Sequence, residues 1–238
     1  GTYETGLAPR LVQGLSGIVF DRFTVGHSHT CAAQKGGGRL FCWGANQHGQ
    51  LGDGTTQDAQ LPIELFADAI TGGQGGGAGQ GGAGGGAGMP ASWNGIQSAG
   101  SFHTCATLER DDRHETYCWG SNQFGQLGQP ASQGPNPTPV RVNDEVSVID
   151  GFDRFDRVFA GGGHTCARGG GDVKPVYCWG KNDFGQLGDS TTASRHEPVR
   201  VNVPKVDTVY TGLDHTCVAV PAPSGNVTLS CWGRNDAG

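Results

Sequence analysis

The chain has 238 residues, which is enough for one large all-β domain or for two domains of ordinary size. Its 44 glycines and 12 prolines disfavour helices, so short strands joined by many turns are expected. A formal net charge of -6 offers no attraction to phosphate backbones or anionic lipids, which argues against nucleic acid and membrane partners. The chain has no apolar run near the roughly 18 residues that cross a bilayer, so membrane insertion is not expected either.

One pattern recurs four times along the chain. Its first half reads Gly-x-x-His-Thr-Cys and occupies residues 26–31, 100–105, 161–166 and 212–217. Its second half reads Cys-Trp-Gly-x-Asn and occupies residues 42–46, 118–122, 178–182 and 231–235. Three copies continue into Gly-Gln-Leu-Gly, at residues 49–52, 125–128 and 185–188. Self-similarity of this kind marks a repeat architecture in which each copy is one supersecondary unit.

Each repeat is expected to form short β-strands around its two cysteines. In residues 39–43, strand alternation places Leu40 and Cys42 on one face and Phe41 and Trp43 on the other. A tryptophan and a histidine recur in every copy, so we expect the tryptophans between successive sheets and the histidines at hydrogen-bonding positions in the core. These residues are Trp43, Trp119, Trp179 and Trp232, and His29, His103, His164 and His215.

The eight cysteines are expected to form one disulfide within each repeat. The expected pairs are Cys31 with Cys42, Cys105 with Cys118, Cys166 with Cys178, and Cys217 with Cys231. These spacings suit a hairpin whose two cysteines lie opposite each other, about 4.5 to 5.5 Å apart at Cα. Pairing in every repeat indicates an oxidising compartment, so an extracellular or cell-surface location is expected, with the periplasm as a further alternative.

A zinc site is the competing interpretation of the cysteines. His29 and Cys31 lie two residues apart on one strand, so they share a face with each other and with Cys42. Protein zinc sites usually contain a Cys-x-x-Cys knuckle, which this chain lacks, and disulfides are therefore favoured. We expect no metal and no cofactor.

Residues 177–188, with the sequence Tyr-Cys-Trp-Gly-Lys-Asn-Asp-Phe-Gly-Gln-Leu-Gly, resemble the regulator of chromosome condensation repeat. In its cysteine-bearing form the repeat is similar to the exported, bacterial-type branch of that family. The resemblance implies an all-β β-propeller, usually of seven blades, in which each repeat completes one blade and begins the next. It also implies a wheel whose faces bind other proteins.

The two ends of the chain have complementary phases within the repeat. The fourth copy stops at Gly238, before a Gly-Gln-Leu-Gly motif, while residues 1–9 have the spacing of residues 54–62. The four repeats could close a four-blade ring or form part of a larger wheel, and the larger wheel is slightly favoured. In both cases residues 1–238 are expected to form a single propeller domain.

Residues 72–88 contain only glycine, alanine and glutamine, and they lengthen the interval between the first two repeats. We expect this segment to be a flexible insertion in the domain. Asn226 begins a glycosylation sequon on the last hairpin, and the sequence leaves its modification open.

Binding should lie where the copies differ, because loops on a rigid scaffold are the usual place for it. Two variable sets stand out: the residues between Gly and His of the first motif, and the residue before Gly-Gln-Leu-Gly. The hairpin tips also vary in length. The candidate binding surface consists of His27, His48, Phe102, Phe124, Phe184 and Leu213. For Phe124 and Phe184 the favoured interpretation is structural, as covers of the turns at Asn122 and Asn182.

The sequence favours an extracellular protein-binding or scaffolding module with no catalytic activity. A hydrolase would be expected to show a paired carboxylate or a nucleophile that departs from the repeat, and none is found. A structural or adhesive module of a larger or self-assembling cell-surface protein is the alternative. A secreted enzyme inhibitor or a GTPase exchange factor is less favoured. We expect a protein partner, whose identity the sequence does not give, or self-association.

Overall fold

The computed structural model describes residues 8, 10–36, 38–66, 92–110, 113–143, 155–222 and 225–236. The glycine-rich insertion at 72–88, most of residues 1–9 and the last two residues lie outside this set. What the sequence predicts for those segments therefore remains a prediction.

The described residues form four antiparallel sheets in which consecutive strands are neighbours. The first sheet contains β1 (Phe20–Val25), β2 (His29–Gln34), β3 (Arg39–Gly44) and β4 (Ala59–Phe66). The second contains β5 (Ser92–Ala99), β6 (His103–Arg110), β7 (Arg113–Asn122) and β8 (Ser132–Arg141). The third contains β9 (Phe155–Ala160), β10 (His164–Gly169), β11 (Val176–Gly180) and β12 (Arg195–Arg200). The fourth contains β13 (Thr208–Thr211), β14 (His215–Pro221) and β15 (Val227–Gly233).

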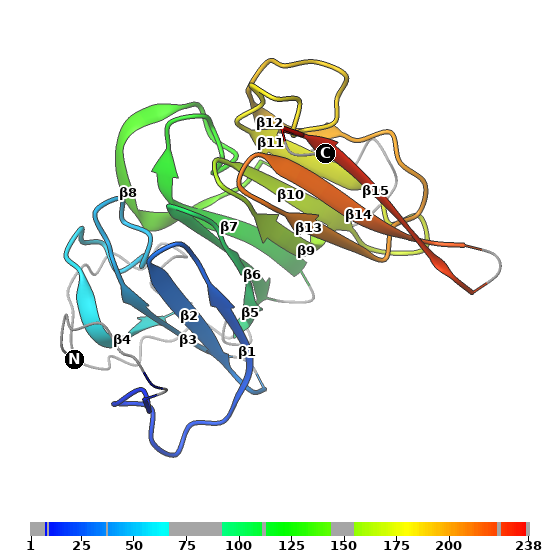
Figure 1. Cartoon of the computed structure of the whole chain (residues 1–238). Helices are drawn as coiled ribbons and strands as arrows, with labels where there is room; N and C mark the ends of the chain where they lie inside the picture. The colour runs from blue at the N-terminus through cyan, green and yellow to red at the C-terminus, as the bar shows by residue number, and fades with distance from the viewer. Residues whose placement is uncertain are drawn as a thin grey trace.

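The sheets follow one another as the blades of an open arc (Figure 1). Contacts join β1 and β2 to β5, β6 to β9, and β10 to β13, so each sheet packs on the next. The first and fourth sheets lie at the two ends of the row (Figure 1). The chain therefore forms part of a propeller, and the four-blade ring that the phase of the repeats left open is not formed. The reason is that the angle between neighbouring sheets, which sequence phase does not encode, decides whether four blades close.

Within each blade the register of the two central strands places the cysteines of one repeat opposite each other. Cys31 pairs with Cys42 in the ladder between β2 and β3, and Cys166 pairs with Cys178 between β10 and β11. Four disulfides result, and they join the pairs that the repeat predicts. No free cysteine remains among the eight, so none of these sulfurs is available as a thiolate ligand for zinc.

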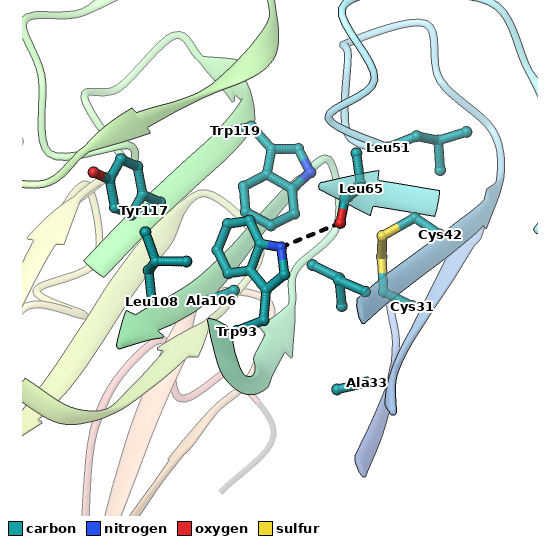
Figure 2. Packing of buried hydrophobic residues seen from close by; sticks show 11 residues of the cluster. Cys31, Ala33, Cys42, Leu51, Leu65, Trp93, Ala106, Leu108, Tyr117 and Trp119 are labelled. Carbon is teal, nitrogen blue, oxygen red and sulfur yellow. Dashed lines mark hydrogen bonds between the residues drawn. A yellow bond between two sulfur atoms is a disulfide. The ribbon is translucent and has the colours of Figure 1, made fainter. Parts of the chain in front are cut away.

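The core lies between the blades, where the face of one sheet that carries the disulfide packs against the face of the next sheet that carries the motif tryptophan. At the first joint the disulfide of Cys31, together with Leu51 and Leu65, packs against Trp93 and Trp119 of the second sheet (Figure 2). Trp93 lies outside the repeat motif, is fully buried, and donates a hydrogen bond to the Leu65 carbonyl (3.3 Å, dashed in Figure 2). Large aromatic side chains thus provide much of the apolar area buried at the first two joints, whereas valines predominate in the buried cluster at the third.

The four motif tryptophans are not equally buried. Trp119 and Trp179 are fully buried between sheets, as predicted. Trp232 is half-buried against the third core cluster, and Trp43 is half-buried on the outer side of the first sheet. The prediction that every motif tryptophan packs between two sheets is therefore wrong for Trp43, because no described sheet covers its face.

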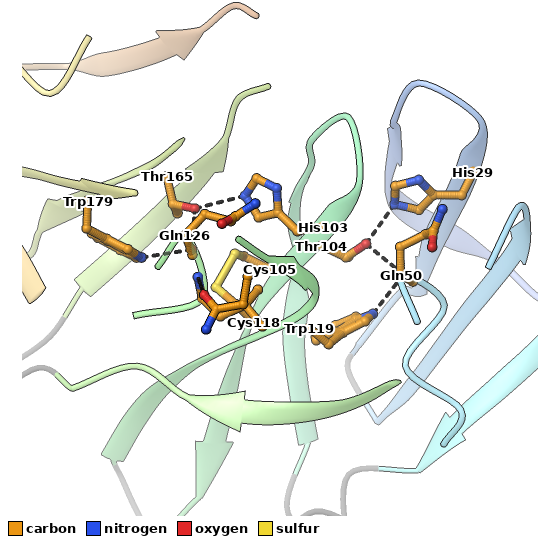
Figure 3. Close-up of a disulfide and its surroundings, with 12 residues drawn as sticks. His29, Gln50, His103, Thr104, Cys105, Cys118, Trp119, Gln126, Thr165 and Trp179 are labelled. Atoms are coloured by element: carbon orange, nitrogen blue, oxygen red, sulfur yellow. Dashed lines mark hydrogen bonds between the residues drawn. A yellow bond between two sulfur atoms is a disulfide. The ribbon is translucent and has the colours of Figure 1, made fainter. Parts of the chain in front are cut away.

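A hydrogen-bond relay crosses each of the three joints in the same way, and Figure 3 shows it at the first two. At the second joint the His103 Nε2 lies 2.9 Å from the Thr165 hydroxyl, which donates to the Gln126 carbonyl at 2.8 Å. The Trp179 indole N–H donates to the same carbonyl at 3.0 Å. The first joint repeats this pattern with His29, Thr104, Gln50 and Trp119, and the third with His164, Thr216, Gln186 and Trp232.

The relay fixes the proton on each of its histidines. The threonine has one hydroxyl hydrogen and donates it to the glutamine carbonyl, so His103 must donate through its Nε2–H. Its Nδ1, like those of His29 and His164, is buried without a hydrogen-bond partner in the described part of the chain. A second proton there would be a buried N–H with no acceptor. Burial accordingly lowers the pKa of His29 and His164 to about 4 and that of His103 to about 3.

Removing the relay hydroxyl should destabilise the joint. The substitution Thr165→Val keeps the shape of the side chain but leaves the His103 Nε2–H buried with no acceptor. We expect the free energy of unfolding to fall by about 2 kcal/mol, measured by urea denaturation. The matched control is Thr30→Val, at the equivalent position of the first repeat, which is half-buried and faces no described sheet. An equal loss in both variants would contradict the relay.

Candidate interaction face

Two sets of connections lie at the same edge of every blade. The turn between the first and second strands and the connection between the third and fourth strands must share an edge, because the strands are antiparallel. The first turn holds the variable pair of Gly-x-x-His, and the second connection holds Gly-Gln-Leu-Gly. We call this edge of the arc the motif face. The hairpin tips between the second and third strands lie at the opposite edge, so the third variable set is separated from the other two.

The Gly-x-x-His turns are bonded to one another across the joints. The backbone N–H of Ser101 donates to the Gly161 carbonyl at 3.2 Å, and that of Gly162 donates to the Gly212 carbonyl at 3.0 Å. The turns approach so closely that a Cβ on Gly100 would lie 2.3 Å from the Gly161 carbonyl oxygen. Glycine is therefore required there, and the turns form a continuous backbone support for the variable side chains.

The Gly-Gln-Leu-Gly turns are held by the buried asparagine that precedes them. The Asn122 side-chain oxygen accepts from the Leu127 backbone N–H at 3.1 Å, and Asn182 does the same for Leu187 at 2.9 Å. The Gln126 side-chain oxygen accepts from the backbone N–H of Phe124 at 2.9 Å. These bonds fix the backbone beneath each variable residue that precedes the motif.

Three predicted site residues meet at the first joint. The ring of Phe102 is 41% exposed and lies between two histidine rings, with centroid separations of 4.9 Å to His48 and 6.0 Å to His27. His27 is exposed and His48 half-buried. The three residues come from two blades, and they form a small exposed aromatic cluster on the motif face.

Two more predicted residues meet around one lysine. The Lys181 Nζ lies 5.7 Å from the ring centre of Phe124 and 5.4 Å from that of Phe184. The Arg234 guanidinium also lies over the Phe184 ring, 4.9 Å from its centre. Lys181 also forms a 2.9 Å ion pair with Asp214, which is buried. Cation–π contacts and the ion pair thus hold two half-covered rings in a fixed arrangement.

Leu213, the sixth predicted residue, is 65% exposed on the fourth blade. It lies over Gly162 of the third blade, where an added Cβ would come within 2.8 Å of its Cδ1 atom. All six predicted residues therefore lie on the motif face, in two clusters and one exposed leucine. Whether they bind a partner remains a prediction.

Sequence reasoning missed Lys181, Asp214 and Arg234. Lys181 and Arg234 occupy the variable position of Cys-Trp-Gly-x-Asn, where the first two repeats have alanine and serine. Asp214 lies beside Leu213 in a pair already known to vary. The signal was present at these positions, but the contacts join different blades and could not be read from one repeat.

The described part of the chain contains no group of three or more His, Cys, Asp or Glu side chains placed to hold a metal ion. Nor do the described residues include a helix that is long and apolar enough to span a membrane.

The sheets, joints and disulfides define a propeller built from disulfide-bearing repeats. A model of the regulator of chromosome condensation (RCC1) repeat matches residues 37–71, 114–168 and 175–219, more than half of the chain. The chain belongs to the RCC1 repeat family.

Several proteins are similar over nearly the whole chain. The ultraviolet-B receptor UVR8 of Arabidopsis thaliana is 28% identical over 100% of this chain and 46% of its own length. The human probable E3 ubiquitin-protein ligase HERC6 is 29% identical over 99% of this chain and 20% of its own length. The chain thus spans less than half the length of these relatives.

Solved structures show the same fold at low sequence identity. Human WBSCR16 matches with a TM-score of 0.67 and 20% identity, over 97% of this chain and 49% of that one. The ectodomain of the Physcomitrella patens receptor kinase CR4 matches with a TM-score of 0.52 and 18% identity, over 95% of this chain and 44% of that one. The arc therefore corresponds to about half of these larger chains.

Proposed function

We propose that this chain is a protein-binding propeller module without catalytic activity, and that it binds its partner through the motif face. The observation that supports this is the exposure of Phe102, Phe184 and Leu213 on a bonded backbone support. Half-exposed aromatic side chains on a rigid surface are typical anchors of protein interfaces, because they bury a large area at a small cost in side-chain entropy.

We further propose that the module works outside the cytoplasm. The four disulfides indicate an oxidising, extracellular-type environment. An extracellular or cell-surface location, with the periplasm as the bacterial equivalent, is the proposal that follows. The assignment to the exported, bacterial-type branch of the family belongs to the same proposal.

The test is capture of a partner from the native surroundings with matched variants. Phe184→Asp should weaken capture of one dominant, stoichiometric partner at least about 30-fold, the effect of losing an anchor that contributes about 2 kcal/mol. The control is Val173→Asp, which places the same change on a 57% exposed residue of the β10–β11 hairpin, at the opposite edge. Equal capture by Phe184→Asp and the wild-type chain, or an equal loss with Val173→Asp, would refute the motif face as the binding site.

A structural module that assembles with its own kind is the second candidate. The observation that favours it is the exposure of Phe23 and Val25 in β1 and of Leu229 in β15, all outside the motif face.

A further inference from the structure

The residue before Gly-Gln-Leu-Gly lies beside a basic side chain at two of the three joints. The Lys181 Nζ of the third blade lies 5.7 Å from the centre of the Phe124 ring in the second blade. The Arg234 guanidinium of the fourth blade lies 4.9 Å from the centre of the Phe184 ring in the third. Both bases occupy the variable position of Cys-Trp-Gly-x-Asn in the next blade along the chain. These two positions therefore form a cation–π contact wherever they hold a ring and a base.

At the first joint the same two positions hold His48 and Ser121. Ser121 carries no charge, and its hydroxyl accepts a hydrogen bond from the Gln126 Nε2 at 3.3 Å. The ring of Phe102 packs against His48 there, with 4.9 Å between the ring centres. Among the described residues, none of the basic side chains that contact a ring lies over Phe102. The first joint thus has the rings of this contact but lacks the base.

The exposure of Phe102 does not depend on where the arc ends. The second sheet packs on the first through β2 and β5, and on the third through β6 and β9. Phe102 is nevertheless 41% exposed. The turn that carries it is bonded to the third blade, because the Ser101 N–H donates to the Gly161 carbonyl at 3.2 Å. The ring is therefore accessible on a fixed backbone with neighbouring blades in place on both sides.

The charge of the motif face favours a basic occupant. Its described turns and connections contain six acidic residues and two basic ones, a formal net charge of -4. The acidic residues are Asp53, Asp58, Asp183, Asp189, Asp214 and Asp236, and the basic ones are Lys181 and Arg234. Both bases are already paired, Lys181 with Asp214 at 2.9 Å and Arg234 with Asp236 at 2.5 Å. The field of this face therefore attracts positively charged segments and repels acidic ones.

We propose that the partner of the motif face inserts a lysine or arginine side chain beside Phe102 and His48. This side chain takes the position that Lys181 and Arg234 occupy at the other two joints. The inference rests on the proposed function, because it assigns the chemistry of the partner that this face binds. Cation–π attraction holds the inserted side chain, and the aspartates of the face steer basic segments toward it.

The test is selection of random peptides, displayed on phage, against the immobilised chain with its disulfides intact. The selected peptides should be enriched in lysine and arginine. In the peptide that binds most tightly, replacing arginine by citrulline or lysine by norleucine removes the charge and largely keeps the shape. This replacement should raise the dissociation constant about 10-fold.

Two variants of the chain locate the binding position. Phe102→Leu removes the ring but keeps an apolar side chain, and it should weaken binding of the peptide about 10-fold. Ser121→Lys gives the second repeat the base that the third has at Lys181, so the chain fills the position itself and binding should weaken by at least as much. The control Val173→Lys adds the same charge at the opposite edge and should change the dissociation constant less than about twofold.

Circular dichroism and the absence of free thiols check that the variants fold. Phe102 is exposed, so its variant decides the outcome if Ser121→Lys does not fold. Failure to select basic peptides, equal binding of the charged and uncharged peptides, or unchanged binding by the folded variants would overturn the proposal. Neutral or acidic peptides that lose affinity with Phe102→Leu would also overturn it, but they would leave the motif face as the binding site. Capture with Phe184→Asp tests that face independently of the charge of the partner.

Discussion

Lowering the pH from 7 to 5 should reduce the free energy of unfolding by about 5 kcal/mol, through the three relay histidines. The folded-state pKa values of His29, His103 and His164 are about 4, 3 and 4, below the ordinary histidine pKa of 6.5 that applies to the unfolded chain. Below pH 6.5 the unfolded chain therefore binds protons that the folded chain excludes. The stabilisation is complete above pH 6.5 and is lost as the pH falls toward 4. Near pH 5 the slope approaches about 4 kcal/mol per pH unit.

The measurement is urea denaturation of the unreduced protein at pH 7, 6 and 5, at one protein concentration. His103→Gln should lower stability at pH 7, and it should also reduce the slope below pH 6 by about 1.4 kcal/mol per pH unit, the contribution of one proton. The matched control is His196→Gln, which makes the same change outside the relay, at a side chain that is 49% exposed. If His103→Gln kept the full slope, the titration could not be attributed to the relay.

Gly120→Ala should destabilise the protein by about 4 kcal/mol, from backbone strain and overpacking together. Gly120 has a φ of +108°, a conformation that residues with a Cβ rarely adopt. An added Cβ would lie 2.5 Å from the Phe102 carbonyl oxygen and 2.8 Å from the His103 Cα. Both are backbone atoms, so no side-chain rotation can relieve the contact. The expected result is a large drop in the urea midpoint with an unchanged slope.

Two control glycines separate the two causes. Gly134→Ala has open space around its Cβ and no positive φ, so its effect should be within about 0.5 kcal/mol. Gly17 has a φ of +77° with nothing within 4 Å, so Gly17→Ala should show strain alone, about 1 kcal/mol. A small effect of Gly120→Ala, equal to that of Gly17→Ala, would show that the backbone yields at this position.

The repeat predicted much of the fold because it records local structure. Alternation about Cys42 gave the two faces of the strand, and equal spacing of the cysteines placed each pair on neighbouring strands of one blade. Contacts between blades cannot be predicted in this way. The relay uses a histidine and a glutamine from one repeat and a threonine and a tryptophan from the next, and no single repeat shows this partnership. The burial of Trp93, which lies outside the motif, was missed for the same reason.

The candidate site was predicted in part. Phe102 and Phe184 were found because they lie at positions where the repeats differ. Positions that vary among aligned repeats are not required by the fold. This choice of residues did not find that Lys181 bridges two of the chosen rings, because the three residues belong to two blades and their meeting depends on the angle between those blades. The exposure of each ring could not be predicted from the sequence either. Phe124 and Phe184 occupy equivalent positions, yet Phe184 is exposed and Phe124 is half-buried.

The relay across each joint runs from one repeat to the next along the chain. This order determines which changes in the number of blades keep the joints intact. Each of the first three repeats supplies a histidine and a glutamine carbonyl to the joint, and the repeat that follows supplies the threonine and the tryptophan. Inserting or removing one whole repeat leaves each remaining joint with a complete set of donors and acceptors. A break inside a repeat instead leaves a joint without one of its hydrogen-bonding groups. Blades should therefore be gained and lost as whole repeats, because each joint between blades is then preserved. This holds wherever in the repeat the duplication begins.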